Sequence, residues 1–146
     1  MCGRFDRHSE LDAFAQLIEG LTPEPMTSVA PSFNIAPSQK ALIVTLDDSA
    51  RRRCQGVDWG LVPSWVNRSD MSRPINARME TVAEKPMFRQ AFKSRRCLVL
   101  CDGYYEWART ESGKHPYYFH MPAEHPFIMA GLWETNSRLM QQSAEP

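Results

Sequence analysis

Short runs of apolar residues, several of them rich in β-branched or aromatic side chains, recur along the chain and predict mainly β-strands. The β-branched run ALIVTL at 41–46 predicts one such strand. The polar segment DDSARRR follows it and reads as a turn, after which CQGVDWGLV at 54–62 returns to a strand-like pattern. Together these segments predict a β-hairpin.

The second half of the chain contains further strand patterns. In RCLVLCDGYYEWA at 96–108 we expect two strands joined at Asp102 and Gly103, because an Asp-Gly pair suits a tight hairpin turn. Two more strands are expected in HPYYFHM at 115–121 and in PFIMAGLW at 126–133.

Two segments instead have apolar residues at helical spacing. Ser9 can cap a helix at 10–19, with Gly20 near its end. The segment EKPMFRQAFKSRR at 84–96 predicts a second helix, whereas the prolines of 22–39 predict a loop. The apolar positions are Leu11, Phe14, Leu17, Ile18 and Leu21 in the first helix and Met87, Phe88, Ala91 and Phe92 in the second.

Short strands with two helices and no regular β–α alternation indicate an α+β fold, with mainly antiparallel strands curled toward a pseudo-barrel. A chain of 146 residues is long enough for one domain with a single core. We therefore expect one domain over residues 1–134 and a polar, frayed tail over 135–146.

The charge balance of the chain bears on whether it binds nucleic acid. Lysine plus arginine number 17 and aspartate plus glutamate number 17, so the chain does not coat nucleic acid through gross charge. Most of the cations are arginines, whose planar guanidinium suits phosphate, so a local basic groove remains open. The chain shows no secretory signal and no membrane-spanning apolar run, and we expect a cytoplasmic protein whose four cysteines are thiols.

The opening sequence MCGRF places Cys2 where removal of Met1 would expose both an α-amine and a thiol. Unperturbed pKa values of about 8 for the amine and about 8.5 for the thiol leave both nucleophiles usable near neutral pH. Such a terminus can condense with an aldehyde and close to a thiazolidine, or attack an amide through the thiolate. The alternative is that Cys2 is an ordinary second residue.

Four other residues suit contacts with a nucleotide or acid–base chemistry. Trp65 follows Pro-Ser in WGLVPSW and could serve as a stacking platform for a base, or be a core tryptophan. In INARMET, Asn76 and Arg78 would share a face if the segment is extended, and could orient an oxygen and hold a phosphate. Glu106 lies between Tyr105 and Trp107, so partial desolvation could fit it for acid–base catalysis; the alternative is an exposed strand residue.

A metal site is not expected. Cys97 and Cys101 lie four apart in an apolar run, and the histidines complete no recognised zinc spacing, so we expect core packing and neither metal nor organic cofactor. The histidines are His8, His115, His120 and His125.

Several separate motifs together resemble one known family, the SOS-response-associated peptidase (SRAP) proteins, also called abasic-site processing proteins. The motifs are MCGRF, FNIAPSQ, WGLVPSW, INARMET, MFRQAF, RRCLVLCDGYYEW and MAGLWE, in the family's order from Met1 to Glu134. The resemblance implies release of Met1, binding of single-stranded DNA at an abasic site, and a thiazolidine between Cys2 and the lesion's aldehyde. It also implies an older proposal of autoproteolytic peptidase activity.

The resemblance also implies roles for individual residues. Cys2 matches the nucleophile, Asn76 the asparagine beside it, and Glu106 the catalytic glutamate. The residues that match DNA contacts or border the site are Arg4, Asn34, Pro37, Trp65, Arg78, Met87 and Phe88.

One departure from the family pattern concerns the C-terminal part. Family members contain further strands and an IHxRMP motif with a catalytic histidine, and none of the histidines here has that context. We therefore expect a C-terminally truncated form of the domain, with exposed sheet edges. The alternatives to DNA crosslinking are an N-terminal-nucleophile thiol peptidase or amidohydrolase, and a catalytically impaired DNA-binding remnant.

Overall fold

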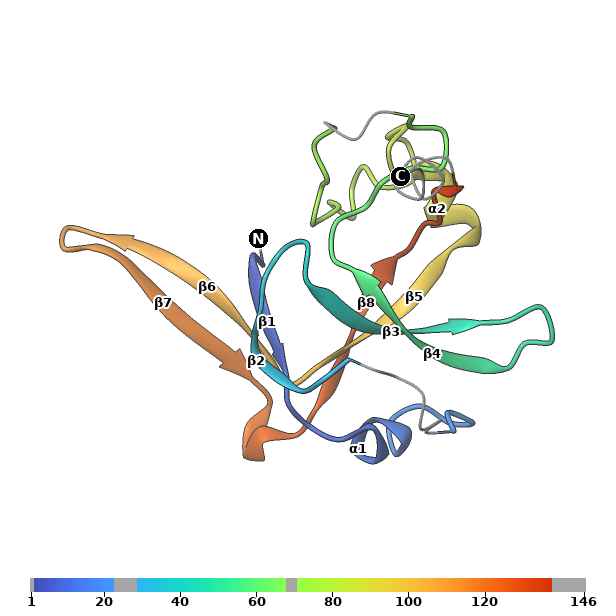
Figure 1. Cartoon of the computed structure of the whole chain (residues 1–146). Helices are drawn as coiled ribbons and strands as arrows, with labels where there is room; N and C mark the ends of the chain where they lie inside the picture. The colour runs from blue at the N-terminus through green and yellow to red at the C-terminus, as the bar shows by residue number, and fades with distance from the viewer. Residues whose placement is uncertain (1, 23–28, 68–70, 138–146) are drawn as a thin grey trace, which may run out of the picture. The chain divides into compact units, whose positions relative to one another are not determined.

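Within residues 2–22, 29–67 and 71–137, which the computed structural model describes, two four-stranded β-sheets carry most of the regular structure (Figure 1). The first sheet has the order β2 (Ser32–Ile35), β1 (Arg4–Arg7), β6 (Gly103–Thr110) and β7 (Gly113–His120). The second has the order β4 (Arg52–Asp58), β3 (Lys40–Leu46), β5 (Arg96–Cys101) and β8 (Phe127–Leu132). The helices are α1 (Leu11–Ala15), α2 (Arg89–Ser94) and the 3₁₀ turn η1 (Pro122–Glu124).

The chain divides into two compact units. The first comprises Met1–Trp59 and Cys97–Ala130 and contains α1 and nearly all of both sheets. The second comprises Gly60–Arg96 and Gly131–Pro146 and contains α2 together with a long series of turns.

Antiparallel pairing dominates the sheets. β1 pairs antiparallel with β2 and β6, β6 with β7, and β3 with both β4 and β5. The predicted α+β fold with mainly antiparallel strands is therefore confirmed. The predicted hairpin of 41–46 with the following segment is confirmed as β3–β4, and the two strands expected at 115–121 and 126–133 are β7 and β8.

Two apolar clusters form the core of the first unit. The inner residues of β3 are buried on both faces of the sheet, which explains the unbroken apolar run in the sequence. One face meets the α1 segment and the other meets β1, where Trp59 packs edge-on against Phe5 at a ring-centroid distance of 5.1 Å. The first cluster contains Phe14, Ile18, Leu21, Leu42, Val44 and Leu100, and the second contains Phe5, Ile35, Ala41 and Cys101.

The prediction that Asp102 and Gly103 form a hairpin turn is wrong. Only Asp102 lies between β5 and β6, Gly103 already belongs to β6, and the two strands are in different sheets. The Asp102 N–H donates to the Asp6 carbonyl at 3.0 Å, so the chain leaves β5 and pairs with β1 instead. The Asp102 carboxylate accepts hydrogen bonds from the N–H groups of His8 and Ser9, at 2.7 and 2.9 Å. These contacts fix Asp102 beside the segment that follows β1.

Both helices are shorter than the sequence pattern predicts. Ser9 does not cap α1, because its hydroxyl donates to the Asp102 carboxylate at 2.5 Å and the N-cap position is Glu10. After α1 the chain continues in turns that still bury Ile18, whereas Leu17 is 50% exposed. Strand β2 lies inside the segment predicted to be a loop.

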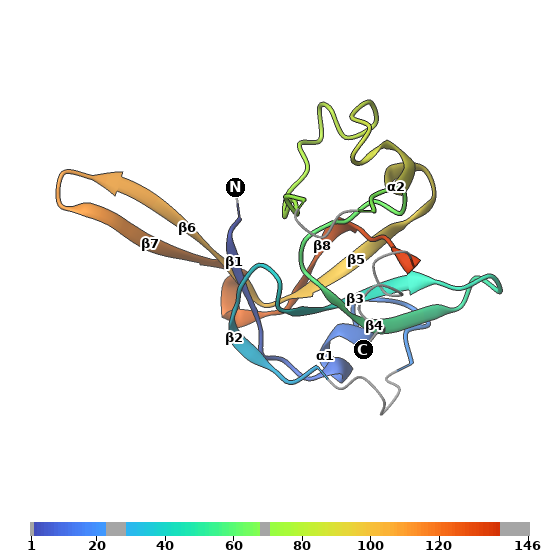
Figure 2. The same ribbon diagram turned by 45° about the horizontal axis from the view of Figure 1, so that its top comes forward.

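The first sheet ends in a long two-stranded ribbon formed by β6 and β7, whose turn lies away from the rest of its unit (Figure 2). Every residue of β7 is exposed. In the second unit, Arg95 and Glu134 form an ion pair at 2.6 Å. Of the expected terminal segment 135–146, residues 138–146 lie outside the described residues, and Asn136 is buried. No helix among the described residues is long and apolar enough to cross a membrane.

Candidate active site

Cys2 lies immediately before β1, half-buried against the second apolar cluster. Its thiol donates a hydrogen bond to the Arg4 carbonyl at 3.3 Å. Burial raises the pKa of the Cys2 thiol, the hydrogen bond to the Arg4 backbone partly opposes this, and the charge of Glu106 raises the pKa further. The thiol is therefore protonated to a greater extent at neutral pH than an exposed cysteine.

Glu106 is placed beside Cys2 by the pairing of β1 with β6. The register pairs Arg4 with Tyr105, so Glu106 is the next residue along β6, at the end of β1 from which Cys2 extends. Glu106 is half-buried, and its carboxylate is close enough to raise the pKa of the Cys2 thiol. The structure therefore brings together the predicted nucleophile and the predicted catalytic glutamate.

Arg4 and Asn34 form a polar pair at the surface of the first sheet. The Arg4 Nη1 group donates to the Asn34 Oδ1 atom at 3.0 Å, and the Asn34 backbone N–H donates to the Ser32 hydroxyl at 3.2 Å. The guanidinium carries five N–H donors in all, so this contact orients it and leaves donors that a phosphate could accept.

Pro37 occupies a tight turn between β2 and β3. The Gln39 N–H donates to the Ala36 carbonyl at 3.0 Å, and Ser38 has a φ of 70°. Proline in the second position and a positive φ in the third are typical of a type II turn. The Ser38 N–H donates to the Trp59 carbonyl at 2.8 Å, which fixes this turn within the first unit.

Trp65 lies in a turn of the second unit that is held by three hydrogen bonds. The Val66 N–H donates to the Pro63 carbonyl at 3.0 Å, and the buried Asn136 amide donates to the carbonyls of both residues, at 2.8 and 2.9 Å. Trp65 is 55% exposed on this turn. The arrangement agrees with a stacking platform and not with a core tryptophan.

The remaining predicted residues also belong to the second unit. Asn76 is half-buried, and Arg78 is exposed where its carbonyl accepts a hydrogen bond from the Thr81 N–H at 3.1 Å. Met87 is half-buried, but Phe88 is only 8% exposed and has little surface to offer a ligand.

The ten predicted residues are thus divided between the two units. The first unit contains Cys2, Arg4, Asn34, Pro37 and Glu106, and the second contains Trp65, Asn76, Arg78, Met87 and Phe88.

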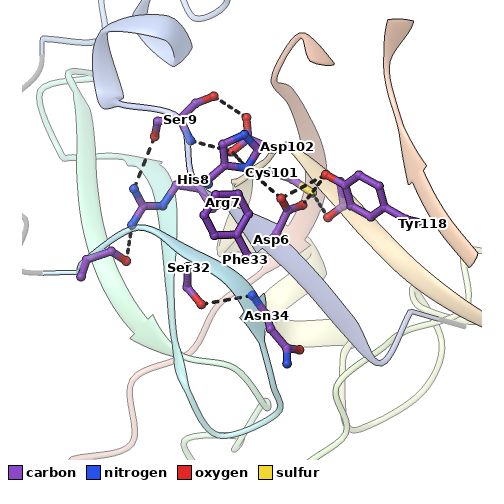
Figure 3. A network of polar contacts seen from close by, with 12 residues as sticks. Asp6, Arg7, His8, Ser9, Ser32, Phe33, Asn34, Cys101, Asp102 and Tyr118 are labelled. Atoms are coloured by element: carbon purple, nitrogen blue, oxygen red, sulfur yellow. Dashed lines mark hydrogen bonds and ion pairs between the residues drawn. The ribbon is translucent and has the colours of Figure 1, made fainter. Parts of the chain in front are cut away.

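A polar network around β1 was missed by the sequence analysis (Figure 3). Asp6 and Asp102 are both 1% exposed, and their carboxylates contact His8 and Tyr118. The one sequence signal was the charged run Asp6-Arg7-His8 directly after an apolar residue, which is unusual for a strand that enters a core.

The other thiols are poor candidates for chemistry. Burial raises the pKa of Cys97 to about 12 and raises that of Cys101 still further. Cys54 is half-buried, and burial raises the pKa of its thiol as well. Within the described residues, no group of three or more His, Cys, Asp or Glu side chains is arranged to hold a metal ion.

Two antiparallel sheets, with a cysteine near the start of the chain beside a glutamate of the neighbouring strand, define an α+β protein with a candidate N-terminal nucleophile. The family model described as "SOS response associated peptidase (SRAP)" matches residues 1–145, and the chain belongs to this family.

Individual relatives support the assignment. The chain is 37% identical over 136 residues to the abasic site processing protein YoaM of Bacillus subtilis, covering 92% of this chain and 60% of YoaM. It is 39% identical over 104 residues to the abasic site processing protein HMCES of Xenopus tropicalis, covering 63% of this chain and 31% of HMCES. A crystal structure of a Bacteroides thetaiotaomicron protein matches with a TM-score of 0.73 and 26% identity, covering 90% of this chain and 61% of that one. The chain thus spans 60% of the length of YoaM.

Proposed function

We propose that this chain binds single-stranded DNA at abasic sites and, after removal of Met1, forms a covalent thiazolidine crosslink through Cys2. The relatives YoaM and HMCES are abasic site processing proteins, and the family is shared. The observation that carries the proposal is the position of Cys2 at the start of β1, within electrostatic range of the Glu106 carboxylate.

The proposed reaction uses both nucleophiles of the terminal cysteine. The α-amine of Cys2 attacks the C1′ aldehyde carbon of the ring-opened abasic sugar, and loss of one water gives an imine. The thiol sulfur then adds to the imine carbon while its proton passes to the nitrogen, which closes the five-membered ring. Glu106 would carry protons between the amine, the leaving water and the thiol.

The state of the thiol favours this order of steps. A cysteine that attacks an amide directly needs a lowered pKa, because the thiolate is the nucleophile. Burial and Glu106 instead raise the pKa of Cys2, so the amine acts first and the thiol adds once an electrophilic imine is beside it. Closure of the ring would protect the DNA, because the imine that promotes β-elimination of the strand is consumed.

DNA contacts are proposed in both units. Arg4, held by Asn34, would bind a backbone phosphate near Cys2, and the Pro37 turn would border the site. The exposed Trp65 would stack on a base of an unpaired strand, which discriminates against intact duplex.

The other residues proposed to contact DNA or the lesion differ in how exposed their side chains are. Arg78 would bind the backbone, and Asn76 would orient the sugar or the nucleophile. Met87 would offer a partly exposed apolar contact, and Phe88, which is buried, would contribute through packing within the second unit.

The proposed reaction draws its acid–base help from Glu106, since the histidines with side-chain contacts in the structure make those contacts elsewhere. His8 contacts Asp6, His115 the Ser112 hydroxyl and His120 the Met121 carbonyl. General acid–base catalysis of this kind is worth about 10²- to 10⁴-fold in rate.

The proposal extends to location and architecture. Reducing cytoplasm would keep Cys2 as a thiol, and in a bacterium the nucleoid supplies the DNA. The two sheets would curl into the expected pseudo-barrel, supported by the chain passing directly from β2 to β3 and from β5 to β6 between sheets.

The test is to incubate the protein with single-stranded DNA that carries one abasic site and to map the adduct by mass spectrometry. We expect a denaturation-resistant adduct at residue 2 that is absent in Cys2→Ala. Cys2→Ser keeps the α-amine and should give only a reversible imine, which borohydride reduction traps. A form with one residue inserted before Cys2 should not crosslink, and undiminished adduct in Cys2→Ala would refute the proposal.

Because the family is described as a peptidase, a second candidate function is that of an N-terminal-nucleophile thiol peptidase that uses Cys2 and Glu106. It would share the catalytic pair but would not require Arg4, Arg78 or Trp65. Cleavage of a peptide substrate in the absence of DNA, lost in Cys2→Ala, would favour it.

A further inference from the structure

Tyr118 and the buried carboxylate of Asp6 link the outer strand β7 to the catalytic strand β1 (Figure 3). The Tyr118 hydroxyl lies 3.1 and 3.0 Å from the two Asp6 carboxylate oxygens and donates to this carboxylate. His8 Nδ1 lies 2.8 Å from Asp6 Oδ2. Tyr118 is 40% exposed as a whole, but desolvation beside the buried Asp6 carboxylate and the hydrogen bond to that carboxylate raise its pKa, so the hydroxyl keeps its proton and remains a donor.

Asp102 adds further hydrogen bonds at the same, C-terminal end of β1. Its carboxylate accepts from the N–H groups of His8 and Ser9 and from the Ser9 hydroxyl. Its own N–H donates to the Asp6 carbonyl. The residue directly before β6 is therefore hydrogen-bonded to Asp6 near the end of β1 and to the two residues that follow β1.

The same network reaches β2, which carries Asn34. The His8 ring stacks on Phe33 with a centroid distance of 4.6 Å and an interplanar angle of 16°. The Tyr105 hydroxyl donates to the Phe33 carbonyl at 3.1 Å, and the Tyr105 ring lies 5.0 Å from that of Tyr118. The orientation of the Arg4–Asn34 pair thus depends on residues of three neighbouring strands.

Burying two carboxylates costs desolvation free energy, so stability alone does not explain their use at this strand. Apolar residues of similar volume often stabilise a core at least as well as a buried charged network does. What the network adds is geometric specificity, because hydrogen bonds fix one register and one orientation where apolar packing tolerates several. β1 has only four residues, and Cys2 extends beyond it, so its register decides where the nucleophile lies.

We propose that Asp6 and Tyr118 are positioning residues, which set the register and orientation of β1 so that Cys2 lies beside Glu106. This inference rests on the proposed crosslinking function. The hydroxyl of Tyr118 contacts the Asp6 carboxylate and so acts on β1 through that residue. Loss of the hydroxyl would allow β1 to shift, and small displacements of reacting groups lower rates strongly while leaving binding surfaces intact.

The test compares Tyr118→Phe, which keeps the ring and removes the hydroxyl, with Thr110→Val, which also removes one hydroxyl at nearly constant size but lies at the far end of β6, four residues beyond Glu106. Single-turnover crosslinking over a series of DNA concentrations gives the limiting rate and the half-saturating concentration. We expect Tyr118→Phe to lower the limiting rate about tenfold and to change the half-saturating concentration less than about twofold. Asp6→Asn, which still accepts from Tyr118, should retain more of the rate than Tyr118→Phe.

The outcomes separate this inference from the proposed function. An unchanged limiting rate in Tyr118→Phe at a temperature well below its melting transition would overturn it, as would an equal loss in Thr110→Val. Amide hydrogen exchange at Arg4 and Phe5 needs no DNA, and faster exchange in Tyr118→Phe would support positioning even if the wild-type chain forms no adduct. Failure of the wild type to crosslink would instead refute the proposed function.

Discussion

Replacement of Gly103 by alanine tests the packing of Tyr118 against the start of β6. An alanine Cβ at this position would lie 2.3 Å from the Tyr118 Cε2, Cζ and Oη atoms, far inside van der Waals contact. The ring must therefore move, and the movement takes its hydroxyl off the buried Asp6 carboxylate.

The expected loss has two parts. Overpacking costs about 1–3 kcal/mol in a well-filled core, and because Tyr118 is 40% exposed its ring can relieve part of this cost by turning toward solvent. A hydrogen bond to a charged group contributes about 1.5–3 kcal/mol, part of which the remaining contact with His8 preserves. We expect Gly103→Ala to lower the free energy of unfolding by about 2–5 kcal/mol. For a chain of this size the melting temperature should fall by about 5–15 °C.

The assay is a thermal melt followed by far-ultraviolet circular dichroism. Gly3→Ala is the matched control, because a Cβ at Gly3 meets no atom within 4 Å, and its melting temperature should not change. In a Tyr118→Ala background the ring is absent, so the further cost of Gly103→Ala should shrink. A melting temperature of Gly103→Ala equal to that of the wild type, or an equal cost in both backgrounds, would refute the reasoning.

Two further changes test separate features. The Asp47 carboxylate accepts from the backbone N–H groups of Arg51 and Ser49 and from the side chains of Arg51 and Arg53, and these bonds lower its pKa to about 2. Because the folded pKa is below the ordinary value of 3.8, the stabilisation is present above that pH and is lost as the pH falls toward 2. Urea denaturation should therefore show Asp47→Asn less stable than the wild type at pH 7, with the difference gone at the acid limit; a difference independent of pH would contradict this. Asn136→Ala should leave the Pro63 and Val66 carbonyls without their amide donor and lower the free energy of unfolding in thermal melts by about 1–3 kcal/mol. Because the turn that carries Trp65 would lose this support, single-stranded DNA binding should also weaken. An unchanged affinity for single-stranded DNA would contradict a role for Trp65 in binding.

The strands that the sequence predicted well are those whose own residues decide their structure. β3 is a β-branched run buried on both faces, so its pattern needs no knowledge of its partners. β2 was missed because Ser32 and Asn34 are polar and the surrounding prolines resemble a loop. Its strand character comes from pairing with β1, which lies far away in the sequence.

The error at Asp102 and Gly103 has the same origin. Turn preferences are local, but the Asp102 carboxylate is used by His8 and Ser9, 94 and 93 positions away in the chain. Gly103 is required by the ring of Tyr118 and not by a turn. In both cases a distant partner overrode the local signal.

The candidate site divides in the same way between local and distant information. Cys2 and Glu106 could be proposed from the sequence because a second-position cysteine and a carboxylate between aromatic residues have chemistry of their own. The Asp6–Tyr118 contact could not, since it joins residues 112 positions apart.

The proposed residues of the two units predict which substitutions affect the reaction rate and which affect DNA binding. The proposed reacting groups Cys2 and Glu106 belong to the first unit, together with the network that orients β1 and the proposed phosphate contact Arg4. The proposed stacking residue Trp65 and the cation Arg78 belong to the second. An interaction made equally before and during the reaction affects affinity alone, whereas a displaced nucleophile affects the rate alone. Substitution of Arg4, Trp65 or Arg78 should therefore change the DNA concentration required for crosslinking, whichever unit holds the residue. Substitution of Glu106 or Tyr118 should instead change how fast the bound lesion reacts.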